Sequence, residues 1–215
     1  HVSNWRRGET SHSSVLQTNA LIANNAAIQE NVVPGNVEKL AQARKYNELL
    51  SAGVITIGAG EHKPSTEASD ETAGLVYEEL LNGLDGIMAR IKIPKIDVDL
   101  PVYHGTSDDV LLKGAGHLQG TSLPVGGIGT HSVISAHRGL ATARMFDDLG
   151  ELEVGDRFVV EVLDEVLTYQ VIETQVIEPD DTETVLPREG EDIVSLITCT
   201  PLGINTHRIL VTGER

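Results

Sequence analysis

The sequence is poor in cysteine, in aromatic residues and in positive charge. Its 215 residues contain one cysteine, 3% aromatic residues, and 16 lysines and arginines against 32 acidic residues, for a net charge of −16. One cysteine excludes an internal disulfide, and an unpaired thiol in an exported protein favours a catalytic role. The negative charge makes nucleic acid and anionic lipid poor partners and a lysine-bearing protein a better one. No apolar run approaches 18 residues, so no membrane-spanning segment is predicted.

The first third of the chain has helical periodicity. We expect one amphipathic helix within Ser14–Val32 and a second over Asn36–Leu50, which Gly53 ends. The apolar stripe of the second helix is predicted to comprise Val37, Leu40, Ala41 and Leu49. From Val54 to Ser69 the periodicity is lost, and a short helix is expected over Thr72–Leu81, before Gly83.

After Gly86 the pattern changes to short strands separated by turns, which is typical of an all-β barrel. We expect a tight hairpin connection at Asp164–Glu165 and a short helix around Thr142–Leu149. The expected strands are Ile87–Ile93, Val98–Tyr103, Ser132–Ala136, Arg157–Leu163, Val166–Ile177, Ile193–Cys199 and Thr206–Val211.

The single cysteine ends one of these strands. Cys199 precedes the turn residues Pro201, Gly203 and Asn205, and Arg208 lies on the strand that follows. A guanidinium beside a thiol favours the thiolate and can hold a developing oxyanion. The alternative is that Cys199 is a small core residue and Arg208 an ordinary ion-paired side chain.

A third segment favours the catalytic interpretation. The apolar strand before His137 delivers this histidine to a turn at Arg138–Gly139. A nucleophilic cysteine needs such an acid or base, and Cys, His and Arg together, without metal or cofactor, suit acyl transfer. The residues leave two rivals: a Cys-His hydrolase that releases the acyl group to water, and an adhesive β-domain in which Cys199 is inert.

With these segments in place, the sequence resembles the sortases, cysteine transpeptidases of Gram-positive cell surfaces with a Thr-Leu-x-Thr-Cys-like signature. Ser195-Leu196-Ile197-Thr198-Cys199 stands in its place, with Ser195 where the family usually carries threonine. The run from Thr200 to Arg208 is similar to the pilin-polymerising class C subgroup, and the match extends from about Met88 to Gly213.

This resemblance implies a closed eight-stranded barrel and three catalytic residues, His137, Cys199 and Arg208. It also implies a Leu-Pro-x-Thr-Gly-type sorting signal of a pilin as donor, a lysine of another pilin as acceptor, and no cofactor. The implied location is the extracellular face of the cell membrane, with anchors outside this sequence. Because the chain begins with His1, we expect a soluble piece of a longer protein.

Class C sortases carry a lid over the active site, anchored by an Asp-Pro-aromatic motif. The corresponding stretch here, Gly53 to Gly74, has its only proline in His62-Lys63-Pro64-Ser65, so the aspartate and the aromatic plug are missing. We still expect the loop to lie over Cys199, held weakly near His62 to Ser65. The expected division is therefore an N-terminal helical appendage (1–53) packing on the barrel, a lid and short helix (54–83), and the catalytic barrel (84–215).

Other motifs point to ordinary structure. The Gly126–Gly129 run precedes a strand rather than a helix, which argues against a phosphate-binding loop. The acidic run Glu178–Glu183 suits a solvated loop better than a Ca²⁺ site. His131 is interpreted as structural. No histidine spacing is typical of zinc ligands, which leaves any bound metal unknown; the histidines considered are His104, His117, His131 and His207.

Overall fold

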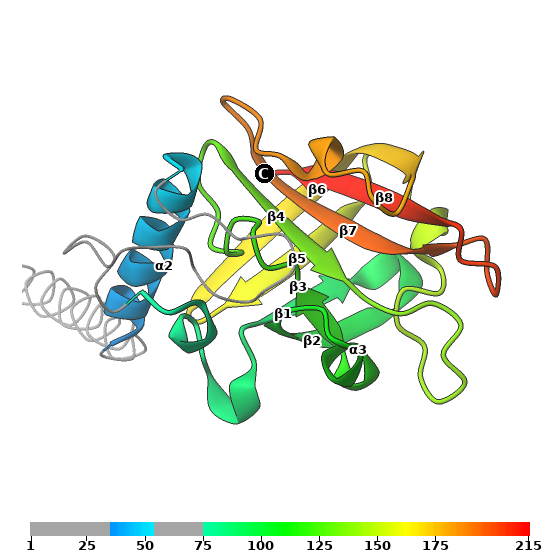
Figure 1. The fold of residues 1–215 in the computed structure, drawn as a ribbon, viewed down its shortest axis with the longest axis horizontal. Coiled ribbons are helices and arrows are strands. Elements are labelled where there is room, and N and C mark those ends of the chain that lie inside the picture. Colours follow the sequence, from blue (N-terminus) through cyan, green and yellow to red (C-terminus); the bar gives the residue numbers. More distant parts are fainter. Residues whose placement is uncertain (1–34, 54–74) are drawn as a thin grey trace, which may run out of the picture. The chain divides into compact units, whose positions relative to one another are not determined.

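Eight strands close into a barrel in the order β1-β2-β3-β4-β7-β8-β6-β5 (Figure 1). The computed structural model describes residues 35–53 and 75–215, and Glu38–Arg215 is one compact unit. The mainly β, closed eight-stranded fold expected from the sequence is confirmed. The strands are β1 Ala89–Ile93, β2 Val98–His104, β3 Ala115–His117, β4 Thr130–Ser135, β5 Arg157–Val162, β6 Glu165–Ile177, β7 Asp192–Thr200 and β8 His207–Glu214.

Two of the strand pairs are parallel, β2 with β3 and β4 with β7, and the other pairs are antiparallel. In β6 the side chains of Leu167, Tyr169 and Val171 point into the core, whereas Val166 is exposed. This alternation is what a strand with one buried face requires. In contrast, β7 is buried on both faces from Asp192 to Leu196, and it lies between β4, its parallel neighbour, and β8, its antiparallel neighbour.

The strand predictions differ from the structure mainly at their ends, but two predictions within the barrel were wrong and two short elements were missed. No helix covers Thr142–Leu149; only a 3-10 turn, Leu149–Glu151, begins at its end. The hairpin between β5 and β6 turns at Leu163 and Asp164, because Val162 pairs with Glu165. Strand β3 and helix α3 (Asp108–Lys113) were not expected, because each is too short to show a periodicity.

Helix α2 (Asn36–Ser51) lies close to its predicted bounds, and Gly53 follows with a positive φ of +73°. The predicted apolar stripe was partly wrong, because Val37 and Ala41 are exposed. The buried face consists of Leu40, Ala43, Tyr46, Asn47 and Leu49.

The Asn47 amide explains the orientation of α2. Asn47 Nδ2 donates to the carbonyl of Leu123 at 3.1 Å, and the Leu123 amide donates to Asn47 Oδ1 at 2.7 Å. Both bonds are buried, where an unpaired amide would be costly. The helix therefore faces the barrel with a polar residue on its contact side.

The segment after residue 75 is anchored by a tyrosine. The predicted helix over Thr72–Leu81 is a single 3-10 turn, Tyr77–Glu79, in its described part. The Tyr77 hydroxyl donates to His117 Nδ1 at 2.7 Å and accepts a bond from the Gly105 amide at 3.1 Å. The expected helix in Ser14–Val32 and the expected lid, including His62, Lys63, Pro64 and Ser65, lie outside the described residues. The three-part division into 1–53, 54–83 and 84–215 stays a prediction.

Candidate active site

Cys199 and Arg208 face each other across the β7–β8 pair. They are direct partners in the antiparallel register, so their side chains project to the same face with Cβ atoms about 5 Å apart. Cys199 is half-buried and lies one residue before the end of β7. The hairpin predicted from the sequence thus has the sulfur and the guanidinium on one face.

His137 reaches the same end of the barrel through the parallel pairing of β4 with β7. The last register pair is Ser135 with Ile197, and His137 and Cys199 each lie two residues further along their chains. The alignment continues past the strand end, because the Ala136 amide donates to the Ile197 carbonyl at 3.3 Å. The register therefore places the three candidate residues at the same end of the barrel.

Among the described residues, Arg208 is bonded only to neutral oxygen atoms. Its Nη1 donates to the carbonyls of Asn205 at 3.0 Å and His207 at 2.9 Å. Within residues 35–53 and 75–215, no carboxylate forms an ion pair with it. Its charge is consequently available to a substrate or an oxyanion.

A model of the sortase domain family matches residues 91–215, more than half of the chain. The chain belongs to the sortase family. Sortase D of Bacillus subtilis is 33% identical over 129 residues, which are 58% of this chain and 62% of that protein. The chain thus spans about 60% of the length of this curated relative.

Solved class C sortases match over nearly their whole length. Sortase C-1 from Actinomyces oris is 45% identical with a TM-score of 0.71, covering 84% of this chain and 98% of that one. Sortase C-1 from Streptococcus pneumoniae is 42% identical with a TM-score of 0.71, covering 91% and 97%. Group B Streptococcus pilus island 1 sortase C2 is 41% identical with a TM-score of 0.70, covering 86% and 99%. The resemblance to class C sortases is confirmed.

The serine that departs from the sortase signature lies in a buried hydrogen-bond chain. His131 Nδ1 donates to the Leu186 carbonyl at 2.8 Å, so Nε2 must accept from the Ser195 hydroxyl at 2.6 Å. Ser195 in turn accepts from the hydroxyl of Thr212 at 2.8 Å. Burial lowers the pKa of His131, which keeps it neutral in this chain. His131 is structural, as predicted, and ties the β6–β7 connection to the barrel.

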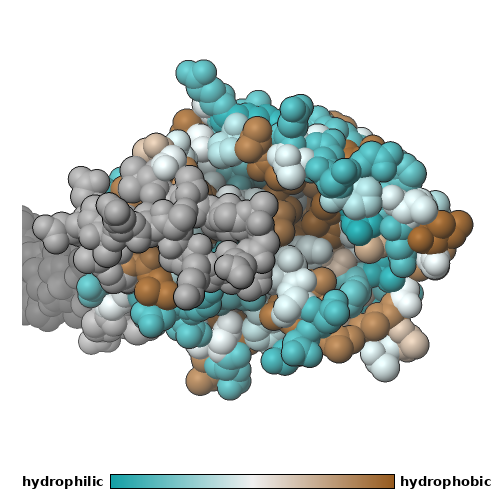
Figure 2. All heavy atoms as spheres, in the orientation of Figure 1, coloured by the Kyte–Doolittle hydropathy of each residue, from teal (hydrophilic) through white to brown (hydrophobic). Residues whose placement is uncertain are grey.

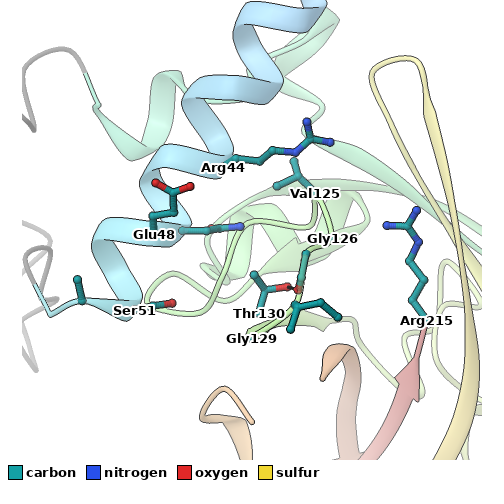
Figure 3. A pocket seen from close by; sticks show the side chains of 12 residues that line it. Arg44, Glu48, Ser51, Val125, Gly126, Gly129, Thr130 and Arg215 are labelled. Atoms are coloured by element: carbon teal, nitrogen blue, oxygen red, sulfur yellow. Dashed lines mark hydrogen bonds between the residues drawn. The ribbon is translucent and has the colours of Figure 1, made fainter. Parts of the chain in front are cut away.

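The glycine run lies at the opposite end of β4 from His137. It lines a cavity of about 650 Å³ together with the end of α2 and Arg215 (Figure 3). Strand β4 begins immediately afterwards at Thr130, so the helix that a phosphate loop requires is missing, as predicted. The Gly127 amide donates to Asp192 Oδ2 at 2.9 Å. This hydrogen bond attaches the glycine loop to the start of β7.

The acidic run Glu178–Glu183 is largely exposed, as a solvated loop should be. The Asp181 carboxylate accepts from the amides of Glu183 at 3.1 Å and Thr184 at 3.2 Å, which closes the loop on itself. Across the described residues, no three His, Cys, Asp or Glu side chains are grouped so that they could hold a metal ion. In the same part of the chain, no helix has the length and apolar character needed to span a membrane.

Arg138, which was expected only as part of a turn, contacts the residue that follows Cys199. Its guanidinium spans from the Asp147 carbonyl to the Thr200 hydroxyl. Its position directly after His137 was a signal, but the partner is 62 residues away in the sequence and cannot be read from spacing.

Proposed function

We propose that this sortase is a cysteine transpeptidase that cleaves a Leu-Pro-x-Thr-Gly-type sorting signal of a pilin and joins it to a lysine of another pilin. The observation that carries the proposal is the register that brings His137, Cys199 and Arg208 to one end of the barrel. These residues can perform acyl transfer without a metal or cofactor.

In the first half-reaction the Cys199 thiolate attacks the threonine carbonyl carbon of the signal, and Arg208 holds the oxygen that becomes negative. His137 donates a proton to the departing glycine amine as the peptide bond breaks, which leaves a thioester on Cys199. In the second half-reaction a neutral lysine amine attacks the thioester and passes its proton to His137. The thiolate departs, an isopeptide bond remains, and the enzyme returns to its starting state.

The surface supports a peptide substrate. Figure 2 shows apolar residues gathered in a hollow on the face where β4 and β7 run side by side in Figure 1, with hydrophilic residues around it. An extended peptide lying along such a hollow would lead toward the ends of both strands, where the candidate residues lie. Similar solved proteins include the sortase C2 of a Group B Streptococcus pilus island and a Streptococcus pneumoniae sortase C described for its pilin substrate specificity.

The charge of the chain supports a lysine as acceptor. The net charge is −16, and the exposed Glu178 lies 3.1 Å from His207, the neighbour of Arg208. An acidic surface beside the site raises the local concentration of an ammonium-bearing partner. Sortases are cell-surface enzymes, and we place this one at the extracellular face of the membrane, held by anchors outside the sequence. The lid over Cys199 stays a prediction from the sequence.

Mass spectrometry of the protein incubated with a sorting-signal peptide tests the proposal. We expect a thioester on Cys199, and transfer of the acyl group to an added lysine peptide rather than to water.

Cys199→Ala and His137→Ala should abolish transfer with the fold intact. Arg208→Lys should lower turnover by about 10²-fold or more, since a lysine ammonium cannot reproduce the planar hydrogen-bonding geometry of a guanidinium. Retained turnover in Cys199→Ala or His137→Ala would refute the assignment. Release to water despite the amine would make the protein a Cys-His peptidase.

A further inference from the structure

Arg138 connects the chain beside His137 to the chain beside Cys199. Its Nε donates to the Asp147 carbonyl at 3.1 Å, and its Nη1 donates to the Thr200 hydroxyl at 3.1 Å. Arg138 directly follows His137 in the sequence, and Thr200 directly follows Cys199. The side chain is half-buried and, among the described residues, forms no ion pair.

The loop that carries Arg138 is itself fixed to the core. The Asp147 carboxylate accepts from the amides of Gly139 at 2.6 Å and Met145 at 3.0 Å. The Phe146 amide donates to the His137 carbonyl at 3.0 Å, and the Phe146 ring is fully buried. The loop from His137 to Asp147 is thus closed at its base, which gives Arg138 a rigid support.

A matching contact lies on the other side of the two candidate residues. The Thr198 hydroxyl donates to the Ala136 carbonyl at 2.7 Å. The residue before His137 is therefore bound to the residue before Cys199, and the residue after His137 to the residue after Cys199. These two hydrogen bonds limit how far apart the segments carrying the His137 imidazole and the Cys199 sulfur can lie.

The contact through Arg138 is the one at the exposed end. Thr200 is the last residue of β7 and precedes Pro201, which has no N–H to continue the ladder. Thr200 is paired with His207 of β8, but the ladder between β7 and β4 ends at the pair of Ser135 with Ile197. Beyond that pair, the side chains of Thr198 and Arg138 hold the chain carrying Cys199 to the chain carrying His137. A guanidinium can bind two oxygens in different directions at once, whereas a lysine ammonium lacks this planar geometry.

We propose that Arg138 is a positioning residue, which holds Cys199 within reach of His137 by binding the Thr200 hydroxyl. This inference rests on the proposed function, because it concerns the geometry of the same reaction. Arg138 acts through Thr200, so removing the hydroxyl alone should reproduce the loss of the arginine. A displacement of about 1 Å between reacting groups can lower a rate by about 10²-fold.

Thr200→Val is the decisive variant, since it keeps the shape of the side chain and the charge of Arg138 but removes the acceptor. We expect kcat for transfer of a sorting-signal peptide to a lysine peptide to fall by about ten- to a hundredfold with KM unchanged. Thr200→Ser, which retains the hydroxyl, should stay within about twofold of the natural protein. Arg138→Gln should resemble Thr200→Val, and the double variant should be no worse than either one.

Arg157→Gln is the matched control for loss of charge. Arg157 is exposed on β5, has no ion pair among the described residues, and lies on a strand that pairs with neither β4 nor β7. Its variant should transfer peptide at the natural rate. Far-UV circular dichroism and thermal unfolding of every variant separate a change in kcat from a loss of folded protein.

An unchanged kcat in Thr200→Val would overturn the inference, whatever Arg138→Gln does, because the arginine would then act by charge or on the substrate directly. Losses that multiply in the double variant would overturn it as well. Neither result touches the proposed function, which fails only if Cys199→Ala or His137→Ala still transfers peptide, or if the natural protein does not.

Discussion

Acid should destabilise this sortase through His117, which is completely buried at the Tyr77 anchor. His117 Nε2 donates to the Ser122 carbonyl at 2.8 Å, so Nδ1 is the unprotonated nitrogen that accepts from the Tyr77 hydroxyl. Burial is the main reason that the pKa of His117 falls from 6.5 to about 4, and nearby His104 lowers it further. Adding a proton would place a charge in the core and remove the acceptor for Tyr77.

The direction and size of this acid effect follow from the linkage between proton binding and folding. The folded-state pKa of about 4 lies below the unfolded value of 6.5, so the unfolded chain binds the proton first as the pH falls. The stability contributed by neutral His117 is fully present above pH 6.5 and is lost progressively toward pH 4. A fall in the pKa from 6.5 to about 4, at 1.36 kcal/mol per pH unit, corresponds to a loss of about 3 kcal/mol.

Urea unfolding followed by far-UV circular dichroism, at pH 7, 6, 5 and 4, measures this loss in the natural protein and in His117→Gln. Glutamine keeps a donor for Ser122 but does not titrate, and His104 titrates in both proteins. We expect the difference in unfolding free energy between the two proteins to be smaller at pH 4 than at pH 7 by about 3 kcal/mol. Dilute samples are needed, because the sequence pI is about 4.8. A difference that does not change with pH would refute the reasoning.

Two other substitutions test the core directly. Tyr77→Phe leaves His117 Nδ1 and the Gly105 amide without their hydrogen-bond partner. It should lower the unfolding free energy by about 2–4 kcal/mol, or Tm by roughly 5–15 °C. An unchanged Tm would show that water replaces the hydroxyl. Gly213→Ala would place a methyl group 2.5 Å from the Phe158 ring and should cost about 1–3 kcal/mol in urea unfolding. Full stability in that variant would mean that the ring can move aside.

The sequence alone determined most of the individual strands and the Cys199–Arg208 hairpin, because these depend on patterns and contacts that are local along the chain. Alternating apolar residues indicate which strand face is buried, and the turn residues between positions 199 and 208 bring the two strands back together. Short elements cannot be predicted in this way. Strand β3 has three residues, which are too few for any alternation to be visible.

Tertiary structure decided what local patterns do not encode. The apolar stripe predicted for α2 included Val37 and Ala41, yet the helix faces the barrel through Asn47, whose amide is satisfied by Leu123 from a distant loop. The expected helix at Thr142–Leu149 yields to a loop whose polar backbone groups are bound by the Asp147 side chain. In α2 a long-range hydrogen bond helps decide which face of the helix is buried, and at Thr142–Leu149 side-chain hydrogen bonds outweigh a weak helical propensity.

The relation of His137 to Cys199 is the clearest example. The sequence indicated both residues, but their proximity depends on the parallel pairing of β4 with β7, in which Thr130 lies beside Asp192. A parallel pair needs a long crossover between its strands, so its register is set by packing and not by a turn. The Arg138–Thr200 contact lies three residues beyond the last pair of that register, Ser135 with Ile197, and becomes visible only once the barrel is closed.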